Sequence, residues 1–192
     1  MLSAVDMPTL PLETEHLILR PYAEDDLTPL HDLFGRADVC RYLMWEPMDL
    51  DATRELLGRR VKQTTIAADG DAMLLAVEER ATGRMIGEFM LHVTSIESGQ
   101  GEIGWSLHPD VQGRGLATEG AREVLRTGFE TLKLHRIVAG ADPRNGASLR
   151  VMEKLGMRKE AELMEMAFVK GEWIDEVIYA ILAGEWEAAK PS

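Results

Sequence analysis

The sequence predicts an α/β protein built around a mixed sheet. Short apolar segments, several of them alternating with polar residues as strands do, occur along the whole chain. Between them lie longer segments whose apolar residues recur every three or four positions, as on the buried face of a helix. A length of 192 residues fits one domain with a sizeable core. We therefore expect one domain over residues 1–192, with poorly ordered ends at about 1–10 and 188–192.

Strands and helices alternate in the first half of the chain. Residues 15–20 alternate until Pro21 breaks the pattern. Asp25 and Asp26 then offer caps for a helix. A glycine in the segment 81–84 joins two apolar runs and predicts a hairpin. The expected elements are a strand at 15–20, a helix at about 25–34, a helix at 51–68 that buries Leu56, Leu57, Val61 and Thr65, strands at 73–78 and 85–93, and a strand at 101–107.

The second half adds a long helix, a short helix and three strands. Apolar residues spaced by three and four positions from Leu116 to Leu132 predict one buried helix face. Gly156 is the expected C-terminal cap of the shorter helix. The turn at 170–172 joins two final strands that we expect to pair. The expected elements are helices at 116–132 and 145–155 and strands at 136–141, 162–169 and 173–182.

Composition excludes several classes of protein. With 21 Lys and Arg against 33 Asp and Glu, the net charge of −12 opposes binding to nucleic acid or to anionic membranes. No window approaches the roughly 20 apolar residues of a membrane span, and the first residues do not resemble a secretion signal. Cys40 is the single cysteine, and we expect a small buried apolar side chain rather than a nucleophile. We expect a cytoplasmic protein without nucleic-acid or membrane partners.

A glycine-rich run between a predicted strand and a predicted helix is the main functional signal. It reads Gln-Gly-Arg-Gly-Leu-Ala-Thr over residues 112–118. Gly113 and Gly115 permit positive φ and let main-chain N–H groups approach a ligand closely. The following helix starts with unpaired N–H groups and a partial positive charge, which together favour a diphosphate. Arg114 adds a cation beside the same anion, and Thr118 can donate a hydroxyl hydrogen bond.

Three kinds of nucleotide-binding turn occur between a strand and a helix. This run lacks residues that two of them need. A Walker-type phosphate loop needs a Gly-Lys-Ser/Thr ending, which this run lacks. A dinucleotide fingerprint needs a third glycine where Thr118 stands and an acidic residue on the next strand, but residues 136–140 contain no acid. The remaining pattern is Gln-x-x-Gly-x-Ala, matched by Gln112, Gly115 and Ala117.

That pattern resembles the acyl-CoA-binding signature of the GNAT superfamily of N-acetyltransferases. A second block, Asn145 to Ser148 followed by a Lys-Leu-Gly-Met ending at residues 154–157, resembles the branch that includes ribosomal-protein N-terminal alanine and serine acetyltransferases. The resemblance extends over about residues 15–186. It implies a mostly antiparallel sheet of about seven strands, splayed at the CoA site and flanked by about four helices.

The resemblance also implies acetyl-CoA as the acyl donor and no metal. The strands around residues 105–108 and 137–142 would part to admit the pantetheine arm. Main-chain groups near Leu107 and Val111 would bind pantetheine, and an N–H near Leu107 would polarise the thioester carbonyl. Lys154 either approaches a phosphate or only decorates its helix. The residues expected to contact CoA are Trp105, Ser106, Leu107, His108, Gln112, Gly113, Arg114, Gly115, Leu116, Ala117, Thr118, Asn145, Ser148 and Lys154.

The implied reaction is direct attack of an uncharged amine on the thioester, with an acid for the departing thiolate and a base for the amine proton. Ser148 is the candidate acid, unless its hydroxyl only binds main chain in the first turn of its helix. Asn145 is expected to contact pantetheine, cap that helix, or both. Glu102 is the first candidate base because burial would raise the pKa of its carboxyl. Glu88 and His92 are the other candidates.

The sequence leaves the acceptor open between a protein N-terminus and a small-molecule amine. Tyr42, Met44 and Trp45 belong either to an acceptor pocket or to the core, and Asp175 and Glu176 either meet a cationic acceptor or protect an edge strand. His108 lacks partners at metal-ligand spacing. Two other functions remain alternatives: a CoA-binding sensor without turnover, or transfer from another donor such as a longer acyl-CoA or an aminoacyl-tRNA. A monomer and a homodimer are both compatible with the sequence.

Overall fold

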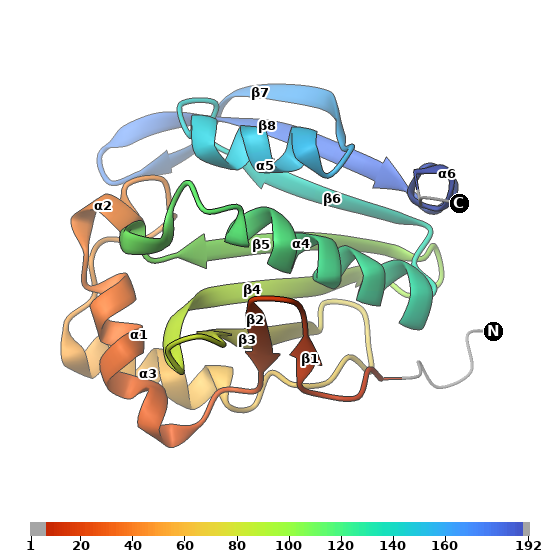
Figure 1. The fold of residues 1–192 in the computed structure, drawn as a ribbon. Coiled ribbons are helices and arrows are strands. Elements are labelled where there is room, and N and C mark those ends of the chain that lie inside the picture. The colour runs from red at the N-terminus through yellow and green to blue at the C-terminus, as the bar shows by residue number, and fades with distance from the viewer. Residues whose placement is uncertain (1–6, 190–192) are drawn as a thin grey trace.

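The computed structural model describes residues 7–189, and these residues build one eight-stranded sheet in the order β1-β2-β3-β4-β5-β6-β8-β7 (Figure 1). Neighbouring strands are antiparallel except β5 and β6, which are parallel. The strands are β1 (Leu12–Glu13), β2 (Leu17–Arg20), β3 (Ala72–Glu79), β4 (Arg84–Ser95), β5 (Gln100–Leu107), β6 (Arg136–Ala141), β7 (Arg158–Val169) and β8 (Glu172–Leu182). The predicted mixed, mostly antiparallel sheet is confirmed.

Six α-helices accompany the sheet within the described residues. They are α1 (Leu27–Phe34), α2 (Ala37–Cys40), α3 (Leu50–Arg60), α4 (Leu116–Arg126), α5 (Gly146–Lys154) and α6 (Ala183–Ala188). A π-helical turn at Thr127–Thr131 continues α4, so the predicted long helix extends nearly as far as expected. Short 3-10 turns at Glu24–Asp26 and Pro109–Val111 precede α1 and the glycine-rich run. None of the helices within residues 7–189 is long and apolar enough to cross a membrane.

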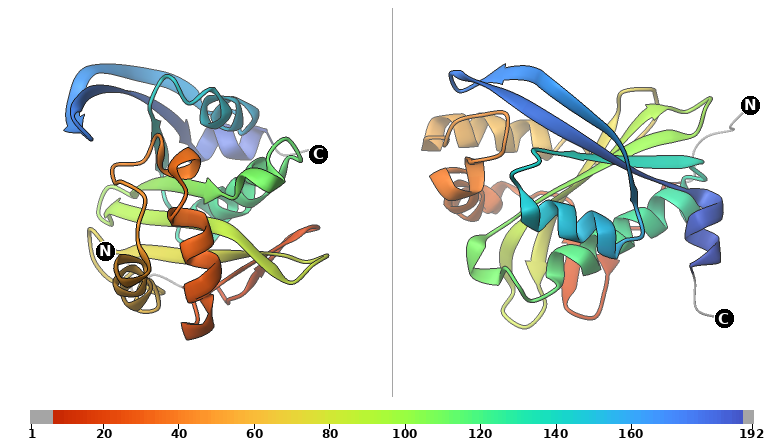
Figure 2. Two further views of the ribbon diagram at one scale, coloured as in Figure 1. Left: turned by 90° about the vertical axis from the view of Figure 1, so that its left-hand side faces the viewer. Right: turned by 90° about the horizontal axis from the view of Figure 1, so that it is seen from above.

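Alternation along β3 sends apolar side chains to two separate clusters. Met73, Leu75 and Val77 join the larger cluster, which also contains Ala121 and Val124 from α4. Leu74 and Ala76 belong to the second cluster, with apolar residues of α1 and α3. Because successive strand residues point to opposite faces, the sheet is covered by α4 and α5 on one face and by α1 and α3 on the other (Figures 1 and 2).

A glycine lets α4 lie close to the sheet. A Cβ at Gly120 would come within 2.3 Å of the Phe89 ring on β4. The strongly amphipathic sequence of α4 buries Ala121, Val124 and Leu125 on the same side. The absence of a side chain at Gly120 therefore allows α4 to pack directly against β4 and β5.

The helix predicted over residues 51–68 is wrong in its second half. The helix α3 ends at Arg60, and Val61 and Thr65 are exposed rather than buried. The residues beyond include a β-branched run with weak helix propensity. The Asp71 carboxylate accepts hydrogen bonds from the N–H groups of Ala67 and Ala68, which holds this segment as a loop.

Short elements account for the other differences. The two-residue strand β1 and the four- and six-residue helices α2 and α6 were not predicted, because such elements are too short to show periodicity. Met7 and Leu10, which belong to the segment predicted to be poorly ordered, pack against the larger cluster. The other residues of the predicted soft N-terminal end, and 190–192 of the C-terminal one, lie outside the described part of the chain. The assignment of residues 1–192 to one domain stays a prediction.

The parallel strands β5 and β6 pair only at their starts. Their partners are Gln100 with Arg136, Gly101 with Ile137 and Glu102 with Val138, after which the strands separate. β4 and β8 continue to pair along the outer sides of β5 and β6. The sheet therefore opens at its centre, as the splayed architecture requires.

Candidate active site

A cleft of about 720 Å³ lies where β5 and β6 part. It is bounded by the end of β5, the loop into α4, the first turn of α4, the start of α5 and the segment around α2. Its lining includes most of the residues predicted to contact CoA: Trp105, Ser106, Leu107, Gln112, Gly113, Gly115, Leu116, Ala117, Thr118, Asn145, Ser148 and Lys154. The structure thus brings together two sequence blocks that lie about thirty residues apart.

The glycine-rich run has the backbone that an anion site requires. Gly113 has φ +75° and Gly115, the N-cap of α4, has φ +82°. The N–H groups of residues 116–118 precede the first intrahelical hydrogen bond, which Glu119 donates to the carbonyl of Gly115. Unpaired amides and the positive end of the α4 dipole therefore border the cleft. This arrangement fits the diphosphate of CoA.

Basic side chains on α5 line the same cleft. Arg150 and Lys154 stand one helical turn apart, and neither forms an ion pair with any residue between 7 and 189. Arg41 and Arg144 also line the cleft, but Arg144 is bound to Asp142 and Glu172. Of these four only Lys154 was predicted. The spacing of Arg150 and Lys154 on one helix face is the signal that would have identified Arg150.

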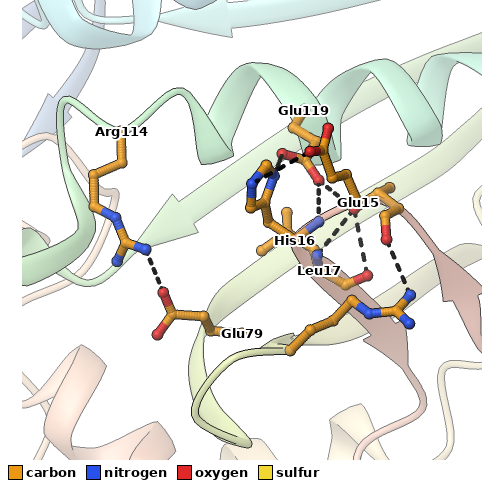
Figure 3. A network of polar contacts seen from close by, with 8 residues as sticks. Glu15, His16, Leu17, Glu79, Arg114 and Glu119 are labelled. Carbon is orange, nitrogen blue, oxygen red and sulfur yellow. Dashed lines mark hydrogen bonds and ion pairs between the residues drawn. The ribbon is translucent and has the colours of Figure 1, made fainter.

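Two residues predicted to contact CoA have side chains directed elsewhere. Arg114 stands in the glycine-rich run, but its guanidinium forms an ion pair with Glu79 on β3 (Figure 3). His108 is 4% exposed, its Nε2 lies 3.5 Å from the Asp32 carboxylate, and its Nδ1 accepts from the Asp110 N–H. The prediction that these two side chains border the cofactor is therefore not supported by their positions. Partners from distant segments hold them.

Ser148 and Asn145, from the second block, both line the cleft. The Asn145 carboxamide accepts a hydrogen bond from the Ser148 N–H at 3.2 Å, so Asn145 caps α5. Ser148 is half-buried and lines the cleft. Within the described residues its hydroxyl makes no hydrogen bond to main chain, so the cap does not occupy it. The hydroxyl is free to meet a ligand.

Glu88 is held in a structural network and is a poor candidate base. Its carboxylate accepts from the Arg60 guanidinium at 3.0 and 3.1 Å and from the Tyr22 hydroxyl at 2.8 Å. Burial, and then the adjacent Glu88 charge, raise the pKa of Tyr22 well above its ordinary value. A carboxylate neutralised by arginine and buried at 6% exposure is poorly placed to accept a substrate proton.

Glu102 lies at the apex of the opening, on the sheet face opposite α4. Its carboxylate is 3.8 Å from Nδ1 of His92, its cross-strand neighbour on β4. It does not line the cleft, so the structure does not place it beside Ser148. Its neighbour Glu176 on β8 extends over Gly140, where a Cβ would lie 2.2 Å from the Glu176 carboxylate. Burial, and then the charge of Glu102, raise the pKa of Glu176.

The residues before α3 divide between cleft and core. Tyr42 lines the cleft, whereas Met44 is 53% exposed. Trp45 packs edge-on against Phe34 at 5.7 Å, as part of the second cluster. Cys40 is buried as expected, and burial raises the pKa of its thiol. Among residues 7–189 no group of three His, Cys, Asp or Glu side chains is placed to hold a metal.

Comparison with known proteins agrees with this geometry. The family model described as an acetyltransferase (GNAT) domain matches residues 16–158. A crystal structure of a GNAT-family acetyltransferase from Bacillus anthracis superposes with a TM-score of 0.82 at 30% identity, covering 92% of this chain and 100% of that one. The uncharacterized N-acetyltransferase YnaD of Bacillus subtilis is 46% identical over 85 residues, which are 44% of this chain and half of that protein.

Two Escherichia coli relatives with named acceptors match over most of their length. The spermidine N(1)-acetyltransferase is 25% identical, with 88% of each chain covered. The ribosomal protein uS5-alanine N-acetyltransferase is 24% identical, with 94% of this chain and 95% of that one covered. Because the GNAT model matches about three quarters of the sequence and the eight-stranded sheet opens at a cleft lined by the glycine-rich run, this chain is an acetyl-CoA-dependent N-acetyltransferase of the GNAT family.

Proposed function

We propose that this enzyme transfers the acetyl group to a primary amine by direct attack within a ternary complex. One observation carries the proposal: a single cleft joins the amide-rich start of α4 to the half-buried hydroxyl of Ser148. The first feature suits the diphosphate of the donor, and the second suits its sulfur. Within the described residues the only cysteine is buried and lies outside the cleft, so an acyl-enzyme on a thiol has no support.

The donor would lie along the cleft from α4 to the end of β5. Amides of residues 113–118 would bind the diphosphate, and Arg150 and Lys154 would attract its negative charge. Main-chain groups of Trp105 to Leu107, together with Asn145, would bind the pantetheine amides. An N–H near Leu107 would stabilise the negative charge that develops on the thioester oxygen, an interaction whose loss costs about 3 kcal/mol in related oxyanion sites.

Proton transfer needs two groups on opposite sides of the thioester. Ser148 would donate to the departing thiolate. On the other face of the sheet, Glu102 and Glu176 would accept the amine proton, directly or through water. Glu176 was predicted either to meet a cationic acceptor or to protect an edge strand, and not as a base. Its position over Gly140 and beside the charge of Glu102 makes it a second candidate base.

The acceptor is proposed as a primary amine that is cationic before it reacts. The two carboxylates at the apex and the net charge of −12 favour such a group. Named relatives act on spermidine and on the alanine of ribosomal protein uS5, so polyamines and protein N-termini are the classes to test first. The fold alone does not choose between them.

A CoA-release assay tests the proposed function. The purified protein is incubated with acetyl-CoA and with polyamines or N-terminal peptides, and we expect thiol release together with a product that is heavier by one acetyl group. Tight CoA binding by calorimetry with no release across the panel would favour a sensor. A product carrying a different acyl group would favour another donor.

The pH dependence of turnover separates the two candidate bases. A base must be ionised to accept a proton, so turnover rises with pH through its pKa. If Glu176 is the base, its raised pKa moves this rise in turnover to a higher pH than an ordinary glutamate would give. Glu102→Gln then moves the rise to lower pH because it removes a neighbouring negative charge. Loss of turnover in Glu102→Gln without such a shift assigns the base to Glu102. Wild-type pH profiles in both Glu102→Gln and Glu176→Gln would exclude a base at this place.

A further inference from the structure

Arg114 stands in the middle of the anion-binding run, yet its charge is used on the far side of that run. One guanidinium nitrogen lies 2.5 Å from a Glu79 carboxylate oxygen, and the side chain does not line the cleft (Figure 3). Glu79 is the last residue of β3, thirty-five positions earlier in the chain. The ion pair therefore ties the glycine-rich run to the β3–β4 turn.

The Glu79 side chain is held in place by burial and by the turn that follows it. It is 7% exposed, and its second carboxylate oxygen accepts from the Thr82 hydroxyl at 2.9 Å. The Thr82 and Gly83 N–H groups both bond to the Glu79 carbonyl, which closes the turn around it. Arg114, followed by Thr82, lowers the pKa of Glu79, so the carboxylate is charged at neutral pH. Arg114 thus binds a group that the hairpin already holds in place.

The segment that Arg114 anchors is one that needs restraint. Gly113 and Gly115 flank it at φ +75° and +82°, and neither would have a neighbouring atom within 4 Å of a Cβ. Glycine loses more conformational freedom on ordering than any other residue, so a loop with two of them pays a large entropic cost when it binds a ligand. A contact that orders the loop beforehand lowers that cost.

A second carboxylate fixes the helix that follows. Glu119 on α4 accepts from the Thr14 hydroxyl, from the His16 N–H at 2.8 Å and from the His16 ring at 2.9 Å (Figure 3). The start of α4 is therefore held against the β1–β2 turn while the loop is held against the β3–β4 turn. Between these two contacts, Gly113 and residues 115–118 line the cleft.

We infer that Glu79 is a positioning residue that orders the diphosphate loop through Arg114 before the donor binds. This rests on the proposed function, because the ligand of the loop is the diphosphate of CoA. Arg114 then holds the conformation of the loop, whereas main-chain amides and the basic residues of α5 bind the negatively charged diphosphate of the donor.

A double-mutant cycle on CoA affinity tests this inference. Calorimetry would measure the Kd for CoA in Glu79→Gln, Arg114→Met and the double variant. We expect each single change to weaken binding about fivefold to tenfold and the double change to add little, because both remove the same contact. The KM for acetyl-CoA should rise in parallel, with kcat and the acceptor KM unchanged. Arg114→Lys should restore part of the affinity.

A matched ion pair provides the control. Glu13 and Arg80 join β1 to the same hairpin at 2.9 Å without touching the loop, so Glu13→Gln should leave the Kd unchanged. Weaker binding in Arg114→Met with wild-type binding in Glu79→Gln would overturn the inference and make Arg114 a direct phosphate ligand. Wild-type affinity in all variants would overturn it as well. Absence of CoA binding by the wild-type protein would instead refute the proposed function.

Discussion

Gly115→Val is expected to weaken CoA binding by about tenfold or more while the protein remains folded. Gly115 has φ +82°, where an L-residue costs roughly 1–2 kcal/mol and a β-branched one is a clear outlier. The valine would therefore turn the chain away from the left-handed conformation that starts α4. Because a Cβ at this position meets no atom within 4 Å, the effect comes from the backbone conformation and not from crowding.

Gly70→Val is the matched control for this variant. Gly70 has φ +90° and an equally open Cβ position, but it lies in the turn before β3 and does not line the cleft. Both variants should lower the Tm by similar amounts, whereas the Kd for CoA, measured by calorimetry, should change only in Gly115→Val. Wild-type affinity in Gly115→Val would show that the loop does not bind the diphosphate. Equal loss of affinity in both variants would point to a general effect of lower stability.

Ser148→Ala is expected to lower kcat about a hundredfold, the lower part of the range for losing a general acid. The Ser148 hydroxyl lines the cleft and bonds to no main-chain group within the described residues. The cap of α5 uses only the Ser148 N–H, so alanine preserves it. The fold and the affinity for CoA should therefore stay close to those of the wild type, as steady-state kinetics and calorimetry would report.

Two further measurements make the Ser148 result specific. Ser98→Ala removes a serine hydroxyl from the β4–β5 turn, away from the cleft, and should leave kcat unchanged. An assay with an acetyl thioester donor whose thiol is a better leaving group than CoA should restore much of the rate in Ser148→Ala. Such a thiolate departs with less help from a general acid. A parallel loss of CoA affinity and kcat would contradict the acid role. It would make Ser148 a binding residue.

The distribution of charge around the cleft explains how an acidic chain binds an anionic donor. The net charge is −12, yet Arg41, Arg150 and Lys154 line the cleft, together with Arg144, which is paired with Asp142 and Glu172. Because screening limits electrostatic attraction to about 8–10 Å at physiological salt, the local cations decide the potential that the donor meets. The carboxylates Glu102 and Glu176 lie on the other face of the sheet, where an amine would meet the opposite potential.

The sequence by itself determined the family, the glycine-rich turn before α4 and most of the strands. Gly113, Gly115 and the start of α4 lie within a few residues of each other, and φ preferences and helix termini depend on such near neighbours. The cap of α5 by Asn145 is local in the same sense, and it was predicted correctly. The helix expected at 51–68 failed because the Asp71 side chain provided another partner for its backbone.

Only the tertiary structure decided which polar side chains are available for chemistry. Glu88 is occupied by Tyr22 and Arg60, from segments 66 and 28 residues away, and Arg114 is occupied by Glu79. Glu176 gained its place beside Glu102 because β8 pairs with β6. A side chain's burial, charge environment and partners depend on segments that meet only when the chain folds, whereas backbone conformation depends largely on neighbouring residues. For this reason the sequence predicted the backbone of the glycine-rich run, but it did not predict which carboxylates are already held by other side chains.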